Sequence, residues 1–196
     1  MIASRPTAAQ AGPSPDLVLR VAAGRPVVPV WRNEIGGVTW QLDDGPGREF
    51  LKVGPAHLEF DVASDIARLS WLAPHVPVAV VLGGGAQDGT VWLHTAGLPG
   101  RSAADPALAA QPPQTARALG RALRRFHDAV PAQDCPFTWS VQDRGGPLPG
   151  RPVPDLDAVV CHGDACTPNT LLTLGPGGRG TPDQAELTME CAARSR

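Results

Sequence analysis

The first half of the chain, up to about residue 93, alternates short apolar runs with turns rich in glycine and proline. Runs of this kind are typical of β-strands. The pattern predicts strands at 17–20, 27–31, 38–42, 49–53, 76–82 and 90–94. Strong turn formers join two pairs of these strands, DDGPGR after residue 42 and GGGAQDG after residue 82, so two hairpins are expected.

Two other segments carry apolar residues at the three- and four-residue spacing of an amphipathic helix. The first is 57–73, with Leu58, Val62, Ile66, Leu69 and Leu72. The second is 115–130, with Leu119, Leu123, Phe126 and Val130 on one side and arginines on the other. One helix is therefore expected within the sheet-forming part, and another in the part that follows.

The order of these elements indicates a fold class. Residues 1–14 lack an apolar period and are expected to be disordered. A hinge is expected near 95–100, and beyond it a polar loop between short strands at 156–160 and 170–172. A small antiparallel sheet with one helix, followed by a hinge and a helical part, is the layout of an α+β, protein-kinase-like two-lobe fold.

Size and charge narrow the range of partners. The chain has 196 residues, a formal net charge of −2 and no basic run, so nucleic acid is not an expected partner. No apolar stretch reaches the roughly 20 residues that cross a membrane, and the N-terminus lacks the apolar core of a secretory signal. We therefore expect a cytoplasmic location and no membrane partner; the sequence leaves the oligomeric state open.

Lys52 is the single lysine among 17 basic residues. Arginine-rich usage is typical of GC-rich coding, so the retained lysine suggests a position where arginine does not serve. A lysine on an edge strand is more often a solvated charge, but a flexible point charge also suits phosphate oxygens. Asp65, on the helix that follows, is the expected carboxylate partner, with Glu59 and Asp61 as nearby alternatives.

Phosphoryl transfer from ATP needs a cover over the phosphates, a cation against them, metal ligands and a base for the acceptor hydroxyl. Gly36 and Gly37, just before a strand, are candidates for the cover, although an ordinary hairpin turn would look the same. In CHGDACTPN, Asp164 has the chemistry of a base and Asn169 that of a Mg²⁺ ligand. The alternative is a tight turn, because Gly, Asp, Pro and Asn are all good turn formers.

These stretches together resemble the aminoglycoside phosphotransferases, particularly those that act on the 3′-hydroxyl. HGDACTPNTLL is similar to their catalytic loop, WRNEIGGVTWQL to their nucleotide loop, DIARLSWL to their lysine-pairing helix, and TAGLPGRSA to their hinge. The resemblance covers about 17–172. It implies Asp164 as the catalytic base, Asn169 on magnesium and Lys52 on the α- and β-phosphates of ATP. It also implies that the main chain of Thr95 and Gly97 contacts adenine.

The resemblance implies ATP- and Mg²⁺-dependent phosphorylation of an aminoglycoside antibiotic, a small-molecule partner. Three departures stand beside it. Asp65 lies where the family prefers Glu, and Asp183 lies where a second metal-binding Asp is expected but without the strand sequence around it. The helices that would complete the second lobe are the third departure, because they have no counterpart here.

The expected organisation is therefore an N-lobe at 15–96, a partial C-lobe with the catalytic loop at 97–174, and an atypical tail at 175–196. Such a tail is what a truncated or frameshifted coding region would produce. It predicts weak or absent activity and poor solubility. Two alternatives remain: a non-catalytic nucleotide-binding remnant, and a small-molecule kinase for another substrate of the macrolide, homoserine or choline type.

Overall fold

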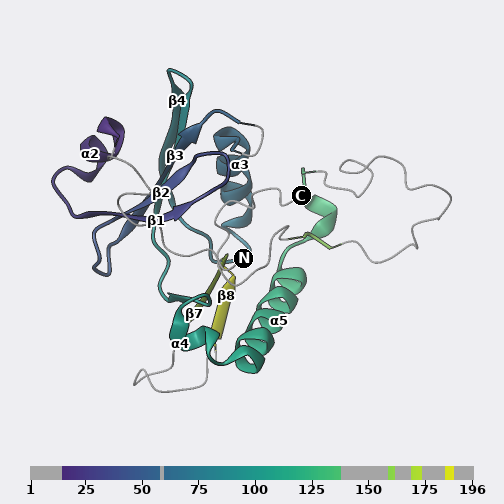
Figure 1. The fold of residues 1–196 in the computed structure, drawn as a ribbon. Helices are drawn as coiled ribbons and strands as arrows, with labels where there is room; N and C mark the ends of the chain where they lie inside the picture. The colour runs from purple at the N-terminus through teal and green to yellow at the C-terminus, as the bar shows by residue number, and fades with distance from the viewer. Residues whose placement is uncertain (1–14, 58–59, 138–158, 162–168, 174–183, 188–196) are drawn as a thin grey trace.

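The computed structural model describes residues 15–57, 60–137, 159–161, 169–173 and 184–187. Its first part holds α2 (Asp16–Ala22), β1 (Val27–Arg32), β2 (Val38–Leu42), β3 (Glu49–Pro55), α3 (Val62–Leu72), β4 (Val81–Gln87) and β5 (Thr90–Ala96). Its second part holds β6 (Arg101–Ser102), α4 (Pro106–Ala109), α5 (Pro112–Ala129), a 3₁₀ turn at Ala132–Asp134, β7 (Thr170–Thr173) and β8 (Gln184–Leu187). The predicted α+β class is confirmed (Figure 1). The disorder expected at 1–14 falls outside the described residues.

The first part is built on a five-stranded antiparallel sheet of strand order β1-β2-β3-β5-β4. Both predicted hairpins are present, β2–β3 and β4–β5. Helices α2 and α3 lie on opposite sides of the sheet (Figure 1). One apolar cluster joins α2 to β2 and β3, and a second joins α3 to β5. The sheet therefore carries two helices rather than the one predicted.

The prediction of a strand at 17–20 is wrong, because these residues belong to helix α2. Val18 and Ala22, four residues apart, are the buried pair that packs on the sheet. Ala23 adopts a left-handed conformation (φ 50°) and ends the helix. A short apolar run fits either periodicity, so the position of the buried pair decides between helix and strand.

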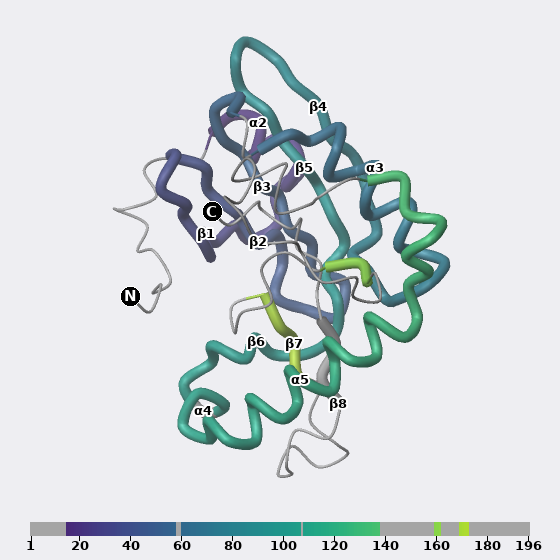
Figure 2. Tube along the Cα trace, turned by 90° about the vertical axis from the view of Figure 1, so that its right-hand side faces the viewer, coloured from purple at the N-terminus to yellow at the C-terminus, as the bar shows by residue number. Residues whose placement is uncertain are grey.

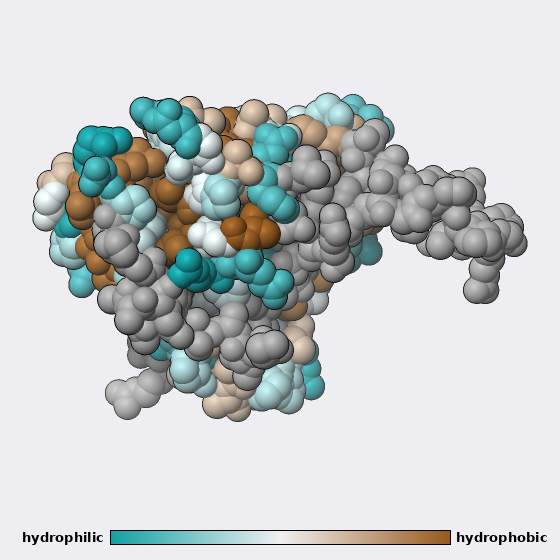
Figure 3. All heavy atoms as spheres, turned by 45° about the horizontal axis from the view of Figure 1, so that its top comes forward, coloured by the Kyte–Doolittle hydropathy of each residue, from teal (hydrophilic) through white to brown (hydrophobic). Residues whose placement is uncertain are grey.

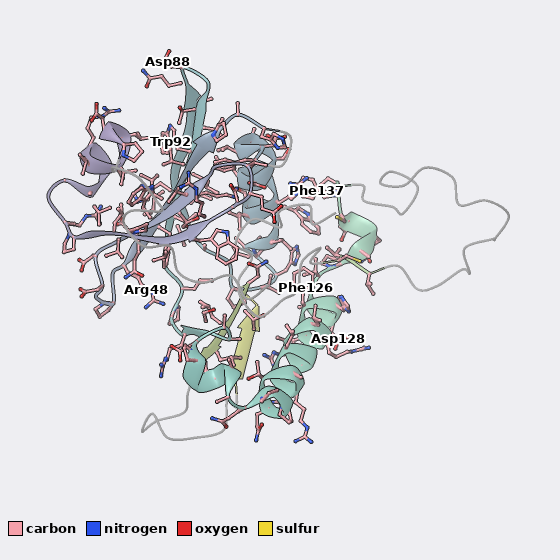
Figure 4. All side chains as sticks on the ribbon, in the orientation of Figure 1. Arg48, Asp88, Trp92, Phe126, Asp128 and Phe137 are labelled. Atoms are coloured by element: carbon pink, nitrogen blue, oxygen red, sulfur yellow. The ribbon has the colours of Figure 1, made fainter. Side chains whose placement is uncertain are left out.

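The prediction for the second hairpin is wrong in its boundaries. Residues 76–80 lie outside the strand, and Gly83–Gly85 lie inside β4 rather than in the turn. A Cβ added at Gly83 or Gly85 would come 3.2 Å from the indole of Trp92 (Figure 4), and one at Gly84 would come 2.9 Å from Ile66. Glycine here allows close packing on both faces of the strand, and the turn itself is formed by Asp88 and Gly89.

In Figure 2, β6, β7, β8, α4 and the start of α5 lie below the sheet, and the chain after α5 rises beside α3, where Phe137 contacts Trp71. Helix α5 begins at Pro112, before the predicted start at 115, and its buried face is formed by Thr115, Ala118, Ala122 and Phe126. Of the four residues predicted on the apolar face, Phe126 and Val130 are buried, whereas Leu119 and Leu123 are only partly buried. The preference for small residues brings the helix close to its neighbours.

Strand β7 is confirmed at its predicted position, but the strand predicted at 156–160 is not seen at 159–160; residues 156–158 lie outside the described part. No strand was predicted in the atypical tail at 175–196. Within it, Gln184–Leu187 forms β8, which pairs with β7 and lies beside α5 (Figure 1). The sheet ladder supplies the order that the polar sequence does not predict.

One apolar core runs through both parts of the molecule. It includes Leu69 of α3, Leu93 of β5, Phe126 of α5 and Leu172 of β7. The described part also leaves large apolar side chains exposed, and Figure 3 shows apolar groups reaching the surface between polar ones. The exposed residues are Leu19, Val28, Val80, Leu82 and Val159. No helix in the described ranges has the length and hydrophobicity to cross a membrane.

A three-residue polar network ties α2 to the sheet. The Oε2 atom of Glu49 lies 2.8 Å from Nη1 of Arg25 and 2.8 Å from Nε2 of His94. Arg25 also donates to the carbonyls of Val21 and Ala22 at the end of α2. Burial alone would raise the pKa of Glu49, but hydrogen bonds from Arg25 and His94 outweigh it and hold the pKa below its ordinary value of 4.5.

This network predicts a loss of stability in acid. Because folding lowers the pKa of Glu49, its contribution is complete above 4.5 and is lost as the pH falls through the lower pKa of the folded protein. Between about pH 5 and pH 3, the urea midpoint of the wild type should therefore fall more steeply than that of Glu49→Gln. The exposed Asp128→Asn serves as the control. Equal slopes for the wild type and Glu49→Gln would contradict the prediction.

Candidate active site

One face of the five-stranded sheet gathers three of the residues predicted to bind a nucleotide. In the ladder, Thr39, Lys52 and Leu93 lie side by side. Phe50, two residues before Lys52 on β3 and therefore on the same face, pairs with Thr95. Gly37 precedes Thr39 by two positions, so it belongs to this face as well. Helix α3 covers the β4–β5 half of the face, where Gly84 contacts Ile66. Gly37, Lys52 and Thr95 thus line a common surface beside α3.

The predicted glycine cover is a tight turn between β1 and β2. Asn33 closes the turn with two hydrogen bonds. Its side-chain Oδ1 accepts from the main-chain N–H of Gly37 at 2.6 Å, and its main-chain N–H donates to the carbonyl of Gly37 at 2.9 Å. Gly36 has φ +89°, a conformation that favours glycine. A Cβ on Gly54 would come 2.8 Å from Gly37 Cα, so the turn packs directly on β3. This contact brings the main chain of the turn to within two residues of Lys52.

Lys52 is half-buried on β3, and its Nζ lies 4.4 Å from the centroid of the buried Phe60 ring. This cation–π contact holds the ammonium group at the edge of the core. Asp65 is 5% exposed and shares the buried face of α3 with Val62 and Leu69. Its Oδ1 lies 3.5 Å from Nη1 of Arg68. Lys52 therefore lies on the sheet face that α3 partly covers, and Asp65 lies on the buried face of α3.

The structure distinguishes Asp65 from Asp61, one of its two acidic neighbours. Asp61 is the N-cap of α3, because its carboxylate accepts from the hydroxyl of Ser64 at 2.6 Å and from Ser64 N at 3.2 Å. Both hydrogen bonds lower the pKa of Asp61, and the bond from the hydroxyl has the larger effect. Glu59 lies outside the described residues. Asp65 is therefore the acidic residue on the buried face of the helix, and its pairing with Lys52 stays a prediction.

The hinge follows β5 directly. Thr95 pairs with Phe50 on β3 and Val81 on β4, which fixes its main chain in the sheet. The N–H of Gly97 donates to Arg48 O at 2.8 Å, and a Cβ on Gly97 would come 2.8 Å from that same oxygen. A ligand that contacts the main chain of Gly97 would therefore have to use its carbonyl oxygen.

Asp164, the predicted base, lies outside the described residues, but Asn169 is described and immediately precedes β7. Thr170, next to it, is fully buried, and its carbonyl accepts from Ala103 N at 2.8 Å. Strand β6, just after the hinge, pairs with β7 through Arg101–Leu172 and Ser102–Leu171. The strand that follows Asn169 is thus paired with the two residues that follow the predicted hinge.

The register of the β7–β8 hairpin bears on the missing second metal ligand. Thr170 pairs with Leu187, and Thr173 pairs with Gln184. In an antiparallel hairpin, the residues that follow the second strand lie next to those that precede the first. A carboxylate of this hairpin that shares a metal ion with Asn169 is therefore expected to follow Leu187. Asp183 lies outside the described residues; Gln184, the residue after it in the sequence, pairs with Thr173 at the end of the hairpin remote from Asn169.

Residues 34–152 match the phosphotransferase enzyme family (APH), which is more than half of the chain. The chain belongs to this family. The resemblance stated from the sequence motifs is thereby confirmed, although the matched residues end before the catalytic-loop motif.

The relatives agree with this assignment. The chain is 29% identical to the aminoglycoside 3′-phosphotransferase of Streptomyces fradiae, over 73% of this chain and 67% of the relative. A crystal structure of an aminoglycoside 3′-phosphotransferase of type VIII superposes with a TM-score of 0.61 at 28% identity, over 76% of this chain and 66% of the other. The chain thus spans about two thirds of the length of the relatives it matches.

A further solved structure is that of the phosphotransferase APH(3″)-Id from Streptomyces rimosus ATCC10970, in complex with ADP and streptomycin. It superposes with a TM-score of 0.57 at 23% identity, over 88% of this chain and 74% of the other. Together with the type VIII enzyme, it confirms the kinase-like fold predicted from the order of elements.

Proposed function

We propose that the chain binds ATP on the α3 side of the sheet and transfers its terminal phosphoryl group to a hydroxyl of an aminoglycoside. One observation carries the proposal: Gly37, Lys52 and Thr95 share a single face of the sheet. This face leads into the hinge, and the residues after the hinge pair with β7, the strand that follows Asn169. Membership of the phosphotransferase family and its aminoglycoside-acting relatives support the substrate class.

The described residues fit a nucleotide along this face. Residues 15–96 would form the nucleotide-binding lobe, with adenine against the main chain of Thr95 and Gly97 and the phosphates near Lys52. The turn at Gly36 and Gly37 has no side chain to hold a phosphate away, and a Cβ at Gly37 would come 2.9 Å from the Asn33 amide. Lys52, half-buried beside Phe60, offers a preplaced positive charge.

The described residues contribute one ligand for Mg²⁺, the side-chain oxygen of Asn169, within the proposed partial C-lobe at 97–174. An amide oxygen suits this hard cation, which when bound would neutralise charge on the phosphates. Asp164, five residues before Asn169, would accept the proton of the acceptor hydroxyl as the oxygen attacks phosphorus. These roles follow from the motif and from the anchoring of Asn169 beside the hinge.

A non-catalytic nucleotide binder is the second candidate, and the hairpin register favours it. Gln184, which follows the predicted second metal ligand Asp183 in the sequence, lies opposite Thr173, at the end of the hairpin remote from Asn169. Without a second carboxylate, transition-state charge would be poorly stabilised, while nucleotide binding on the sheet would persist.

The test uses the full chain. Isothermal titration with ATP, with and without Mg²⁺, measures binding, and transfer of the radiolabelled terminal phosphoryl group to kanamycin measures catalysis. Macrolide, homoserine and choline acceptors serve as the comparison. We expect ATP binding and transfer to kanamycin above the other acceptors. ATP binding without transfer would favour the binder, and no binding of ATP would overturn both proposals.

Lys52→Met should weaken ATP binding about 10- to 100-fold, the loss of a charge-assisted hydrogen bond worth ~1.5–3 kcal/mol. Adenosine, which has no phosphates, should bind the variant as it binds the wild type. Arg20→Met, which removes an exposed positive charge on α2, is the matched control. An ATP affinity for Lys52→Met within twofold of the wild type would remove Lys52 from the proposed site.

A further inference from the structure

Arg48, which the sequence did not single out, links the start of β3 to the hinge. Its Nη2 donates to the carbonyl of Leu98 at 2.7 Å and to that of Gly100 at 3.0 Å. Its own carbonyl accepts from the N–H of Gly97 at 2.8 Å. Figure 4 shows Arg48 at the lower edge of the sheet, where the chain leads down toward α4. One residue thus bonds to three of the four residues from 97 to 100.

The hinge is held from its other side by β7. Gly100 has φ +122°, and a Cβ there would come 3.2 Å from Leu171 Cβ and 3.2 Å from Leu172 O. The next residue, Arg101, pairs with Leu172. Residues 97–101 are therefore fixed between Arg48 on one side and the strand that follows Asn169 on the other.

Arg48 immediately precedes β3, the strand that carries Lys52, and the two residues are four positions or about 13 Å apart along the extended chain. The adenine end of a bound nucleotide would contact the hinge, and the phosphate end would contact Lys52. The bonds from Arg48 set the position of the hinge relative to this strand, and hence the distance between the two contacts. A planar guanidinium reaches both carbonyls at once, whereas a lysine ammonium on a shorter side chain does not reproduce that fork.

We infer that Arg48 is a positioning residue for the base of the nucleotide: it holds the main chain of the hinge at residues 97–100 in the place where it contacts adenine. This inference rests on the proposed binding of ATP. Arg48 need not touch the nucleotide itself, because it acts through the carbonyls of Leu98 and Gly100.

The test compares two probes on the full chain by isothermal titration: ADP, which has a base, and tripolyphosphate, which has none. The variants are Arg48→Met, which keeps the aliphatic stem, Arg48→Lys, and the control Arg101→Met. Arg101 lies beside the hinge but pairs with Asp105 at the surface, at 2.8 Å. Circular dichroism establishes that each variant is folded, and Arg48→Lys carries the test if Arg48→Met does not fold.

We expect Arg48→Met to bind ADP at least tenfold more weakly and tripolyphosphate within twofold of the wild type. Arg48→Lys should fall between the two, and Arg101→Met should match the wild type. Equal ADP affinity in Arg48→Met and the wild type, or equal losses for both probes, overturns the inference. A wild type that binds tripolyphosphate but not ADP also overturns it while leaving the phosphate site intact. A wild type that binds neither overturns the proposed function as well.

Discussion

Replacing Asp164 with Ala is expected to lower the rate of phosphoryl transfer about 10²- to 10⁴-fold, the range by which a positioned general base accelerates proton transfer. Nucleotide affinity should stay within about twofold of the wild type, because the proposed base faces the acceptor hydroxyl rather than the nucleotide. The measurement is the initial rate of transfer from radiolabelled ATP to kanamycin, paired with a titration of ADP.

Asp183→Ala is the matched control for this substitution. It deletes the same carboxylate from a residue next to the end of the hairpin remote from Asn169, since Gln184 pairs with Thr173. We expect its rate to match that of the wild type. Equal rates for the wild type and Asp164→Ala would remove Asp164 from the mechanism. A tenfold loss in Asp183→Ala would instead contradict the exclusion of Asp183 that the hairpin register supports.

Phe126→Ala is expected to reduce the free energy of unfolding by about 3–5 kcal/mol, which is the cost of deleting a buried aromatic side chain and leaving a cavity. Phe126 is 3% exposed and belongs to the core that runs from α3 and β5 to α5 and β7. Domains are typically stable by only about 5–15 kcal/mol, so a large share would be lost. Urea unfolding followed by circular dichroism measures it.

Leu19→Ala is the control, because Leu19 is 53% exposed and its truncation removes little buried surface. Its unfolding free energy should stay within about 0.5 kcal/mol of the wild type. A loss below about 1 kcal/mol in Phe126→Ala would mean that α5 is not part of a shared core. Because that core spans both parts of the molecule, we also expect one cooperative unfolding transition rather than two.

Local sequence patterns predicted the elements whose signals are local. The β2–β3 hairpin follows from its turn residues, α3 and α5 from helical spacing, and β7 from its position after the polar loop. The pattern failed where tertiary contacts decide the structure. The run at 17–20 is a helix because Val18 and Ala22 pack on the sheet, and Gly83–Gly85 is strand because Trp92 packs across it.

The candidate site divides in the same way. Lys52 and Gly37 could be selected from residue type and position, and Thr95 was implied by the family resemblance; the ladder then places them on one face. Arg48 could not, because it is one of many arginines and its hydrogen-bond partners lie 50 and 52 residues further along the chain. The hairpin register that pairs Gln184 with Thr173 was equally hidden, since the tail sequence gives no strand signal.

The bonds from Arg48 limit how the two parts of the molecule can move. A freely swinging hinge must absorb a change of backbone dihedrals within a few residues. Here a swing about residues 97–100 would stretch the bonds from Arg48 to Leu98 and Gly100, because Arg48 precedes β3 in the first part, whereas the bonds of Arg101 and Ala103 to β7 lie within the second part. We therefore expect the sheet and the helical part to keep their relative orientation as long as the Arg48 bonds hold.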